Sequence, residues 1–135
     1  MNNRILKVVV LLTFLVAVIG VILMVQDNGQ SENEPESFIE LINSQPGVVI
    51  DVRTEQEYNA GYLTIADAQY DWRNGEFHEV IVDLDKEETY YLYCRTGNRS
   101  SQAADLMREN GFQNVYNIGG FKDLTVAGFD AAKAD

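Results

Sequence analysis

The chain has 135 residues, of which 46% are hydrophobic and 23% charged, and its formal net charge is −11. This length predicts one domain of ordinary size, and the hydrophobic fraction excludes a chain that is disordered throughout. The acidic excess repels phosphate backbones and anionic lipid, so nucleic-acid binding is not expected. The single cysteine, Cys94, and the single histidine, His78, exclude an internal disulfide and a cysteine- or histidine-rich metal site.

A long apolar run follows the first basic residues of the chain. Arg4 and Lys7 precede Val8–Val25, 18 residues without a charge that would span roughly 27 Å as a helix. Because the run exceeds the apolar core of a cleaved signal, residues 1–26 are interpreted as a signal anchor, with a removed signal peptide as the alternative. The basic residues precede the span and acidic residues follow it. The remaining chain is therefore expected on the periplasmic or cell-surface side.

Polar residues 27–36 are expected to be a linker, residues 37–130 a folded domain and residues 131–135 a tail. Apolar runs rich in β-branched and aromatic residues predict three strands, Val48–Val52, Tyr90–Cys94 and Val115–Ile118.

Apolar residues at helical spacing predict the helices between these strands. One begins with Ser37 as its N-cap, one begins at a capping box of Thr54 and Glu57, and one covers Arg99–Asn110. Phe77–Leu84 is interpreted as a helix with a strand as the alternative, and Leu63–Tyr70 as a short strand with a loop. Strands that alternate with helices predict an α/β fold with a mostly parallel central sheet flanked by helices.

The segment Cys94-Arg95-Thr96-Gly97-Asn98-Arg99-Ser100 lies between a predicted strand and a predicted helix. Open α/β sheets bind ligands at the carboxyl ends of their strands, and a short glycine-containing loop can direct several backbone N–H groups at one anion. The helix N-terminus and the two arginines also favour a thiolate, so the pKa of Cys94 is expected below its usual value. We therefore predict a nucleophile at Cys94 rather than a small buried apolar residue.

Other polar and aromatic residues are assigned mainly structural roles. Asp51 and Arg53 are expected to be structural, with Arg53 paired to an acid such as Glu57. Trp72 and Arg73 either line the mouth of the site or belong to an ordinary surface loop. His78 is expected at the surface, and the three tyrosines of one strand are expected to pack against helices (Tyr90, Tyr91 and Tyr93).

Three segments resemble one known family. The loop from Cys94 to Ser100 resembles the active-site loop of rhodanese-like sulfurtransferases, and Val49–Arg53 with Glu57-Tyr58 and Gly61 resembles the first strand and helix of that family. Asn117–Phe121 resembles its closing segment. A short domain of this kind behind an export segment is most similar to single-domain, phage-shock-protein-E-type extracytoplasmic rhodaneses, although Tyr62 and Ile65 replace the family's usual histidine and glycine.

The resemblance implies transfer of sulfane sulfur through a Cys94 persulfide, from thiosulfate or a persulfide donor to a thiol or cyanide. It implies that residues Arg95 to Arg99, extending to Ser100, hold the persulfide, that Arg95 or Arg99 orients the anionic donor, and that no metal or other cofactor is needed. A monomer is expected.

Two further readings of the loop stay open. The Cys-x4-Arg spacing is one residue shorter than the loop of related phosphatases, which favours sulfur transfer over arsenate or phosphate chemistry. A non-catalytic module that senses sulfur or redox state, or binds a partner, is the other alternative.

Overall fold

The computed structural model describes residues 2 and 35–134. The chain divides into two units between residues 32 and 33, and residues 35–134 all belong to the second unit. The apolar run Val8–Val25, predicted as a membrane anchor or signal, lies outside the described residues. Within the described part of the chain, no helix combines the length and the apolar character that crossing a membrane requires.

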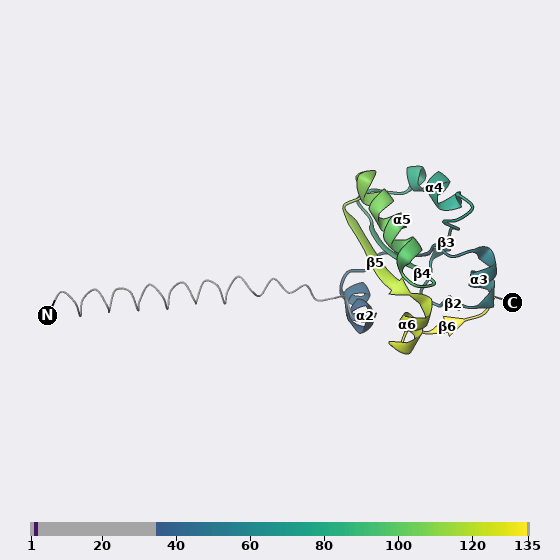
Figure 1. The fold of residues 1–135 in the computed structure, drawn as a ribbon, viewed down its shortest axis with the longest axis horizontal. Helices are drawn as coiled ribbons and strands as arrows, with labels where there is room; N and C mark the ends of the chain where they lie inside the picture. Colours follow the sequence, from purple (N-terminus) through teal and green to yellow (C-terminus); the bar gives the residue numbers. More distant parts are fainter. Residues whose placement is uncertain (1, 3–34, 135) are drawn as a thin grey trace. The chain divides into compact units, whose positions relative to one another are not determined.

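Within residues 35–134, the main sheet has four parallel strands in the order β3-β1-β4-β5, and a second sheet pairs β2 with β6 antiparallel (Figure 1). The strands are β1 (Val48–Asp51), β2 (Tyr62–Leu63), β3 (Ala68–Gln69), β4 (Thr89–Cys94), β5 (Asn114–Gly120) and β6 (Ala131–Ala132). The helices are α2 (Pro35–Ser44), α3 (Glu55–Ala60), α4 (Glu76–Val80) with the 3-10 turn η1 (Ile81–Asp83), α5 (Asn98–Glu109) and α6 (Phe121–Val126). The predicted α/β fold with a mostly parallel central sheet is confirmed.

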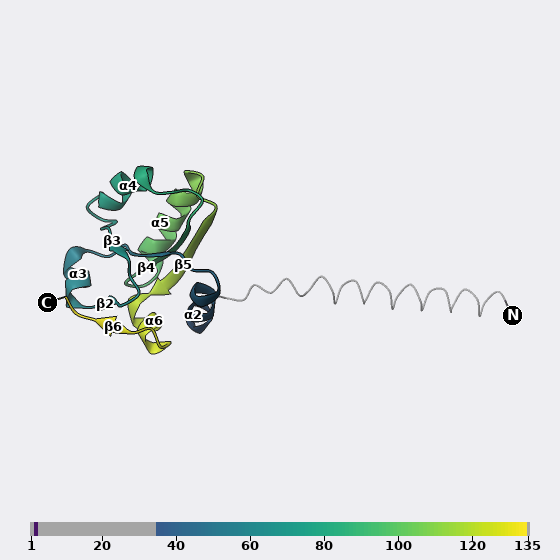
Figure 2. The same ribbon diagram turned by 180° about the vertical axis from the view of Figure 1, so that it is seen from behind.

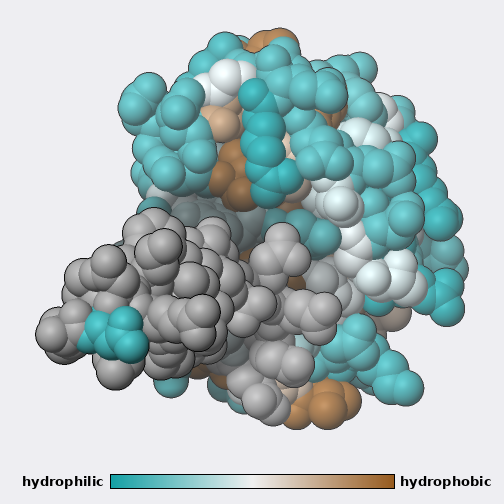
Figure 3. Space-filling view, turned by 60° about the vertical axis from the view of Figure 1, so that its left-hand side comes forward, coloured by the Kyte–Doolittle hydropathy of each residue, from teal (hydrophilic) through white to brown (hydrophobic). Residues whose placement is uncertain are grey.

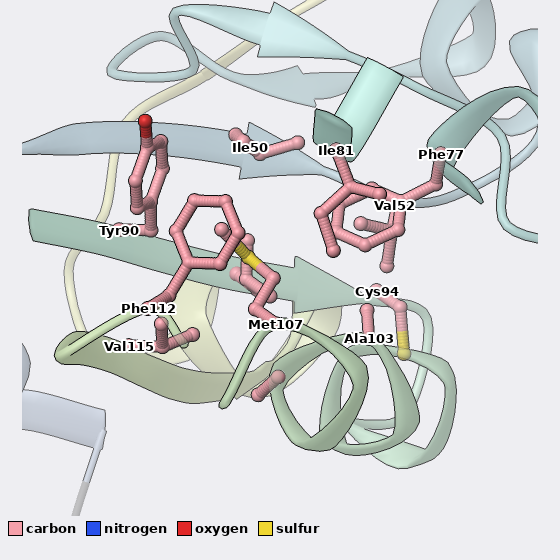
Figure 4. Close-up of a cluster of buried hydrophobic side chains, with 12 residues drawn as sticks. Ile50, Val52, Phe77, Ile81, Tyr90, Cys94, Ala103, Met107, Phe112 and Val115 are labelled. Atoms are coloured by element: carbon pink, nitrogen blue, oxygen red, sulfur yellow. The ribbon is translucent and has the colours of Figure 1, made fainter. Parts of the chain in front are cut away.

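Strand β4 lies at the centre of the domain, and all six of its residues are buried. Because successive side chains of a strand point to opposite faces, Leu92 and Cys94 enter one hydrophobic cluster and Tyr91 and Tyr93 enter another. Helices α4 and α5 cover the first face, and α2 and α6 cover the second (Figures 1 and 2). In Figure 4, the sulfur of Cys94 lies at the end of its strand, directed toward the helix that carries Ala103.

The strand register places the candidate loop at one edge of the sheet. Asp51 of β1 pairs with Tyr93, and Cys94 pairs with Gly120 of β5, so the carboxyl ends of three strands meet there. The residues that follow β1, β4 and β5 therefore come together, although they are far apart in the sequence.

The structure also differs from the predicted elements. Ser37 lies within α2 rather than capping it, because the helix begins at Pro35, and proline is well tolerated in a first helical turn. The segment Phe77–Leu84 is helical in α4 and η1, so the strand alternative was wrong. Helix α6 was not predicted, and β6 lies within the segment expected to be a tail.

The face of the domain seen in Figure 3 is mostly hydrophilic, with small hydrophobic patches.

Candidate active site

The thiol of Cys94 lies against the backbone of the loop that follows it. The residue is fully buried, and its Sγ accepts a hydrogen bond from the backbone N–H of Gly97 at 3.1 Å. Burial raises the pKa of Cys94, but hydrogen bonds from the Ser100 hydroxyl and from the N–H groups of Ser100, Thr96 and Gly97 outweigh it. The net pKa is lowered. These groups stabilise an anion at the sulfur, which agrees with the expected lowering of the thiol pKa.

Helix α5 begins directly at the loop and adds its N-terminal dipole to the same site. Its N-cap is Gly97, whose φ of 87° lies in the left-handed region, where an L side chain is strained. The first turn of α5 carries no acidic residue, so no carboxylate of that turn opposes the anion. Glycine at this position lets the chain turn from β4 into α5 within a few residues.

Arg99 is held away from solvent by an ion pair with Glu57. Its Nη1 and Nη2 donate to Oε2 and Oε1 of Glu57 at 2.7 and 2.8 Å, and the residue is only 8% exposed. The same carboxylate completes the predicted capping box, because it accepts from the N–H and hydroxyl of Thr54. The Arg99 guanidinium, with help from Thr54, lowers the pKa of Glu57 to about 2. Helix α3 is therefore fastened to the start of α5.

Arg53 pairs with an acid, as predicted, but the acid is Asp51 and not Glu57, which was named as an example. Arg53 pairs with Asp51 at 2.6 Å, and it also donates to the carbonyl of Gly61. Its guanidinium lies 4.3 Å from the ring centre of Phe121. Asp51 and Arg53 are two positions apart at a strand end, so their side chains lie on the same side of the chain. Both residues join α3 and α6 to the sheet, which agrees with the structural role expected of them.

Asn117 on β5 holds the loop from behind, and sequence reasoning did not single it out. Its Nδ2 donates to the carbonyl of Gly97 at 3.1 Å, while its Oδ1 accepts from the N–H of Gly119 at 3.1 Å and from the hydroxyl of Ser100 at 2.7 Å. The N–H of Gly119 can only donate, so the orientation of the amide is fixed. The polar residue within a short apolar strand was the available sequence signal.

The exposed part of the loop is its first half and its tip. Arg95, Thr96 and Asn98 are exposed, whereas Arg99 and Ser100 are buried. Gly120 packs against the first half, because a Cβ there would lie 2.9 Å from the carbonyl oxygen of Arg95. The structure therefore brings all the predicted loop residues to one edge of the sheet, with Arg95 facing solvent. The catalytic role of Cys94 and the binding role of the loop stay predictions.

The remaining candidates lie outside this cluster. Trp72 is half-buried and packs against Phe77 and His78, with ring centres 5.9 and 4.4 Å apart. Arg73 and His78 are exposed. The strand tyrosines are core residues, and the hydroxyl of Tyr93 accepts a hydrogen bond from the N–H of Leu63.

Known proteins are similar to this chain in both sequence and fold. Thiosulfate sulfurtransferase GlpE of Pseudomonas putida is 32% identical over 103 residues, which cover 74% of this chain and 88% of that protein. The tRNA sulfurtransferase of Vibrio cholerae is 32% identical over 97 residues, or 67% of this chain and 20% of that protein. A solved structure described as rhodanese with anions from E. coli is 31% identical, with a TM-score of 0.55, and the match covers 64% of this chain and 96% of that one.

A further match agrees with these relatives. The Alr3790 protein from Anabaena shares the fold, with a TM-score of 0.60 and 23% identity, over 73% of this chain and 90% of that one. The sequence profile of the rhodanese-like domain matches residues 34–127. With this match over most of the chain, and with a GlpE relative that it covers almost completely, the chain belongs to the rhodanese-like domain family.

Proposed function

We propose that the chain is a thiosulfate sulfurtransferase that works through a persulfide on Cys94. The observation that carries the proposal is the buried Cys94 Sγ, which accepts the Gly97 N–H at 3.1 Å in a Cys-x4-Arg loop at the start of α5. A thiolate that such hydrogen bonds stabilise is present at neutral pH and can act as a nucleophile, and the same donors can stabilise the negative charge of a persulfide. The GlpE relatives support the choice of thiosulfate as the donor.

The first half-reaction loads the enzyme. The Cys94 thiolate attacks the outer sulfur of thiosulfate, the bond between the two thiosulfate sulfurs breaks, and sulfite leaves with the bonding electron pair. The negative charge moves from Sγ to the outer sulfur of the new persulfide. The backbone N–H groups of Thr96, Gly97 and Ser100, which lower the pKa of the Cys94 thiol, can stabilise this charge as it develops.

The second half-reaction returns the enzyme to its starting state. A nucleophile, cyanide in an assay or a thiolate in the cell, attacks the outer sulfur of the persulfide. The sulfur–sulfur bond breaks, its electron pair returns to Sγ, and the product is thiocyanate or an acceptor persulfide. The two substrates react in separate steps, so ping-pong kinetics are expected.

The test uses the fact that Cys94 is the only cysteine of the chain. Thiosulfate should add about 32 Da, one sulfur atom, to the intact protein, and cyanide should remove it as thiocyanate. Cys94→Ser, which has no thiol at all, should show neither the added mass nor turnover. Equal rates in both proteins would contradict the proposal. A thiol that titrates at about 8.5 or above and takes no sulfur from thiosulfate would favour the sensing or binding alternative.

The proposal includes a location outside the cytoplasm, supported by the charge pattern around Val8–Val25. Protease added to intact spheroplasts should then degrade the domain, while a cytoplasmic marker stays intact. Protection of the domain until the membrane is broken would contradict this location.

A further inference from the structure

A cavity of about 300 Å³ lies beside the first half of the active-site loop. Its walls include Arg95 of the loop, Glu57 and Gly61 from the α3 region, and Phe121 and Lys122 from α6. These segments are brought together by the meeting of the strand ends, and none of the sequence predictions included Phe121 or Lys122 as ligand-binding residues.

The uncompensated charges of the cavity are positive. Glu57 is neutralised by Arg99, and Arg53, which also lines the cavity, is neutralised by Asp51. By contrast, Arg95 and Lys122 form no ion pair with any residue in the part of the chain that the structure describes. Two free cations face one cavity in a chain whose net charge is −11. This local charge favours an anion there.

Two wall residues of the cavity connect it to the active-site loop. Arg95 directly follows Cys94 in the chain. Glu57 binds Arg99, and Arg99 in turn lies close enough to Cys94 that the thiol, after the larger effect of Glu57, contributes to its raised pKa. The cavity is therefore lined by Arg95 of the loop and by Glu57, the carboxylate partner of Arg99.

The size of the cavity indicates that its ligand is larger than thiosulfate or cyanide. Cavities of roughly 300 Å³ and more hold organic ligands, with apolar walls and a few charged groups that set orientation. Thiosulfate has only five heavy atoms and cyanide has two, so neither would fill this space. Phe121 and Gly61 supply apolar and backbone surface, and Arg95 and Lys122 supply the charged groups.

We propose that this cavity is the acceptor site, and that it selects a small organic thiol that carries a carboxylate, held by Arg95 and Lys122. The proposal rests on the proposed sulfurtransferase function and narrows its acceptor. The thiolate of the bound acceptor attacks the outer sulfur of the Cys94 persulfide. The electron pair of the broken sulfur–sulfur bond returns to Sγ, and the acceptor leaves as its own persulfide. Arginine suits this task because its planar fork can bind a carboxylate with two hydrogen bonds.

The test compares acceptors of different charge on the full-length protein, with thiosulfate as the donor. Mercaptosuccinate carries two carboxylates, and 2-mercaptoethanol carries none. Lys122→Gln should raise the KM for mercaptosuccinate about three- to tenfold and change the KM for 2-mercaptoethanol less than about twofold. Lys122→Glu should enlarge the difference. High salt should reduce the preference of the wild type for mercaptosuccinate, because it screens exposed charges.

A matched control removes the same charge at another site. Lys86 lies before β4, at the opposite end of that strand from Cys94, and its Nζ is 6.0 Å from the ring centre of Phe112. Lys86→Gln should leave both KM values unchanged. Equal changes for the two thiols in Lys122→Gln, or no change, would overturn the acceptor site. If thiosulfate adds no mass to the wild type before any thiol is present, the sulfurtransferase function itself fails, and the acceptor site fails with it.

Discussion

The two halves of the active-site loop are held in different ways. Beyond Gly97, Arg99 and Ser100 are buried and fixed by side chains from α3 and β5. Before Gly97, Arg95 and Thr96 are exposed, and their nearest support is the backbone of Gly120. The same short segment therefore contains a rigid part and an open part.

This difference separates two tasks that one loop must perform. Lowering the pKa of a buried thiol requires donors that stay in place, because a misplaced N–H group no longer offsets the cost of burying a charge. Binding a substrate requires groups that solvent can reach. The charge of Arg99 is paired with Glu57, and this ion pair holds α3 against the start of α5 as a brace. Arg95 is exposed, so its charge is available to a substrate. The sequence left open which arginine binds the donor, and we propose Arg95, because it is exposed whereas Arg99 is buried against Glu57.

Breaking the brace should have the largest effect on stability. Glu57→Gln leaves the buried guanidinium of Arg99 without a counter-charge, and we expect the free energy of unfolding to fall by about 2 kcal/mol. Urea unfolding at pH 7 measures it. The matched control is Asp105→Asn, which breaks the exposed pair of Asp105 and Arg108 and should cost less than about 1 kcal/mol. Equal losses in the two variants would show that the Glu57 pair is not a brace.

The same pair should make stability depend on acid. The pKa of Glu57 is lowered to about 2 in the folded protein and lies near 4.5 when the side chain is free. A lowered pKa contributes stability above the unfolded value, and this contribution is lost as the pH falls from about 4.5 toward 2. The wild type should therefore lose stability more steeply than Glu57→Gln in this range. Parallel pH profiles of the two proteins in urea unfolding would contradict the assignment.

Replacing Asn117 should disturb the half of the loop beyond Gly97, and the pKa of the Cys94 thiol should report this. Asn117→Ala leaves the N–H of Gly119 without its partner and removes the side-chain amide that donates to the carbonyl of Gly97, which keeps the N–H of Ser101 as a donor, so the support of the loop is weakened. We expect the pKa of Cys94 to rise, because weaker hydrogen bonds stabilise the thiolate less. The pH profile of alkylation by iodoacetamide measures this directly. Asn114→Ala, at the other end of β5, should leave the profile unchanged, and a shift of the same size there would point to a general loss of packing.

Much of this fold could be predicted from local patterns. The strand Tyr90–Cys94 is a continuous apolar run, and the capping box of Thr54 and Glu57 follows from residues three apart. Gly97 and the following helix could also be read from the sequence. These features depend on neighbours in the chain, and periodicity and capping rules describe such neighbours.

The contacts that fix the loop could not be predicted in the same way. Arg99 and Glu57 are 42 residues apart, and Asn117 and Gly97 are 20 apart, so only the order of the strands brings them together. From the sequence, Glu57 was only an example of an acid that could pair with Arg53. In the structure, Asp51 and Arg53 lie on the same side of the chain and pair with each other, so Arg53 does not pair with Glu57.

A smaller change in the fixed half should come from the hydroxyl of Ser100. This hydroxyl lies within reach of the Gly97 carbonyl and Asn117 Oδ1, and it also helps to lower the pKa of Cys94. One proton cannot serve all three acceptors at once, so its contribution to the thiolate should be partial. Ser100→Ala should raise the pKa of the thiol by less than Asn117→Ala does, because the backbone donors stay in place. Ser101→Ala, at an exposed position, is the control for the alkylation profile.

The open half should show the smallest effect on stability and a clear effect on binding. Arg95 is exposed and forms no ion pair within the described part of the chain, so Arg95→Gln should change the free energy of unfolding by less than about 0.5 kcal/mol. The thiol pKa should also stay nearly constant, because the N–H donors belong to Thr96, Gly97 and Ser100. The KM for thiosulfate should nevertheless rise several-fold, since the donor is an anion in a field of net charge −11. An unchanged KM, or a loss of stability like that of Glu57→Gln, would contradict the assignment of substrate binding to one half of the loop and of structural support to the other.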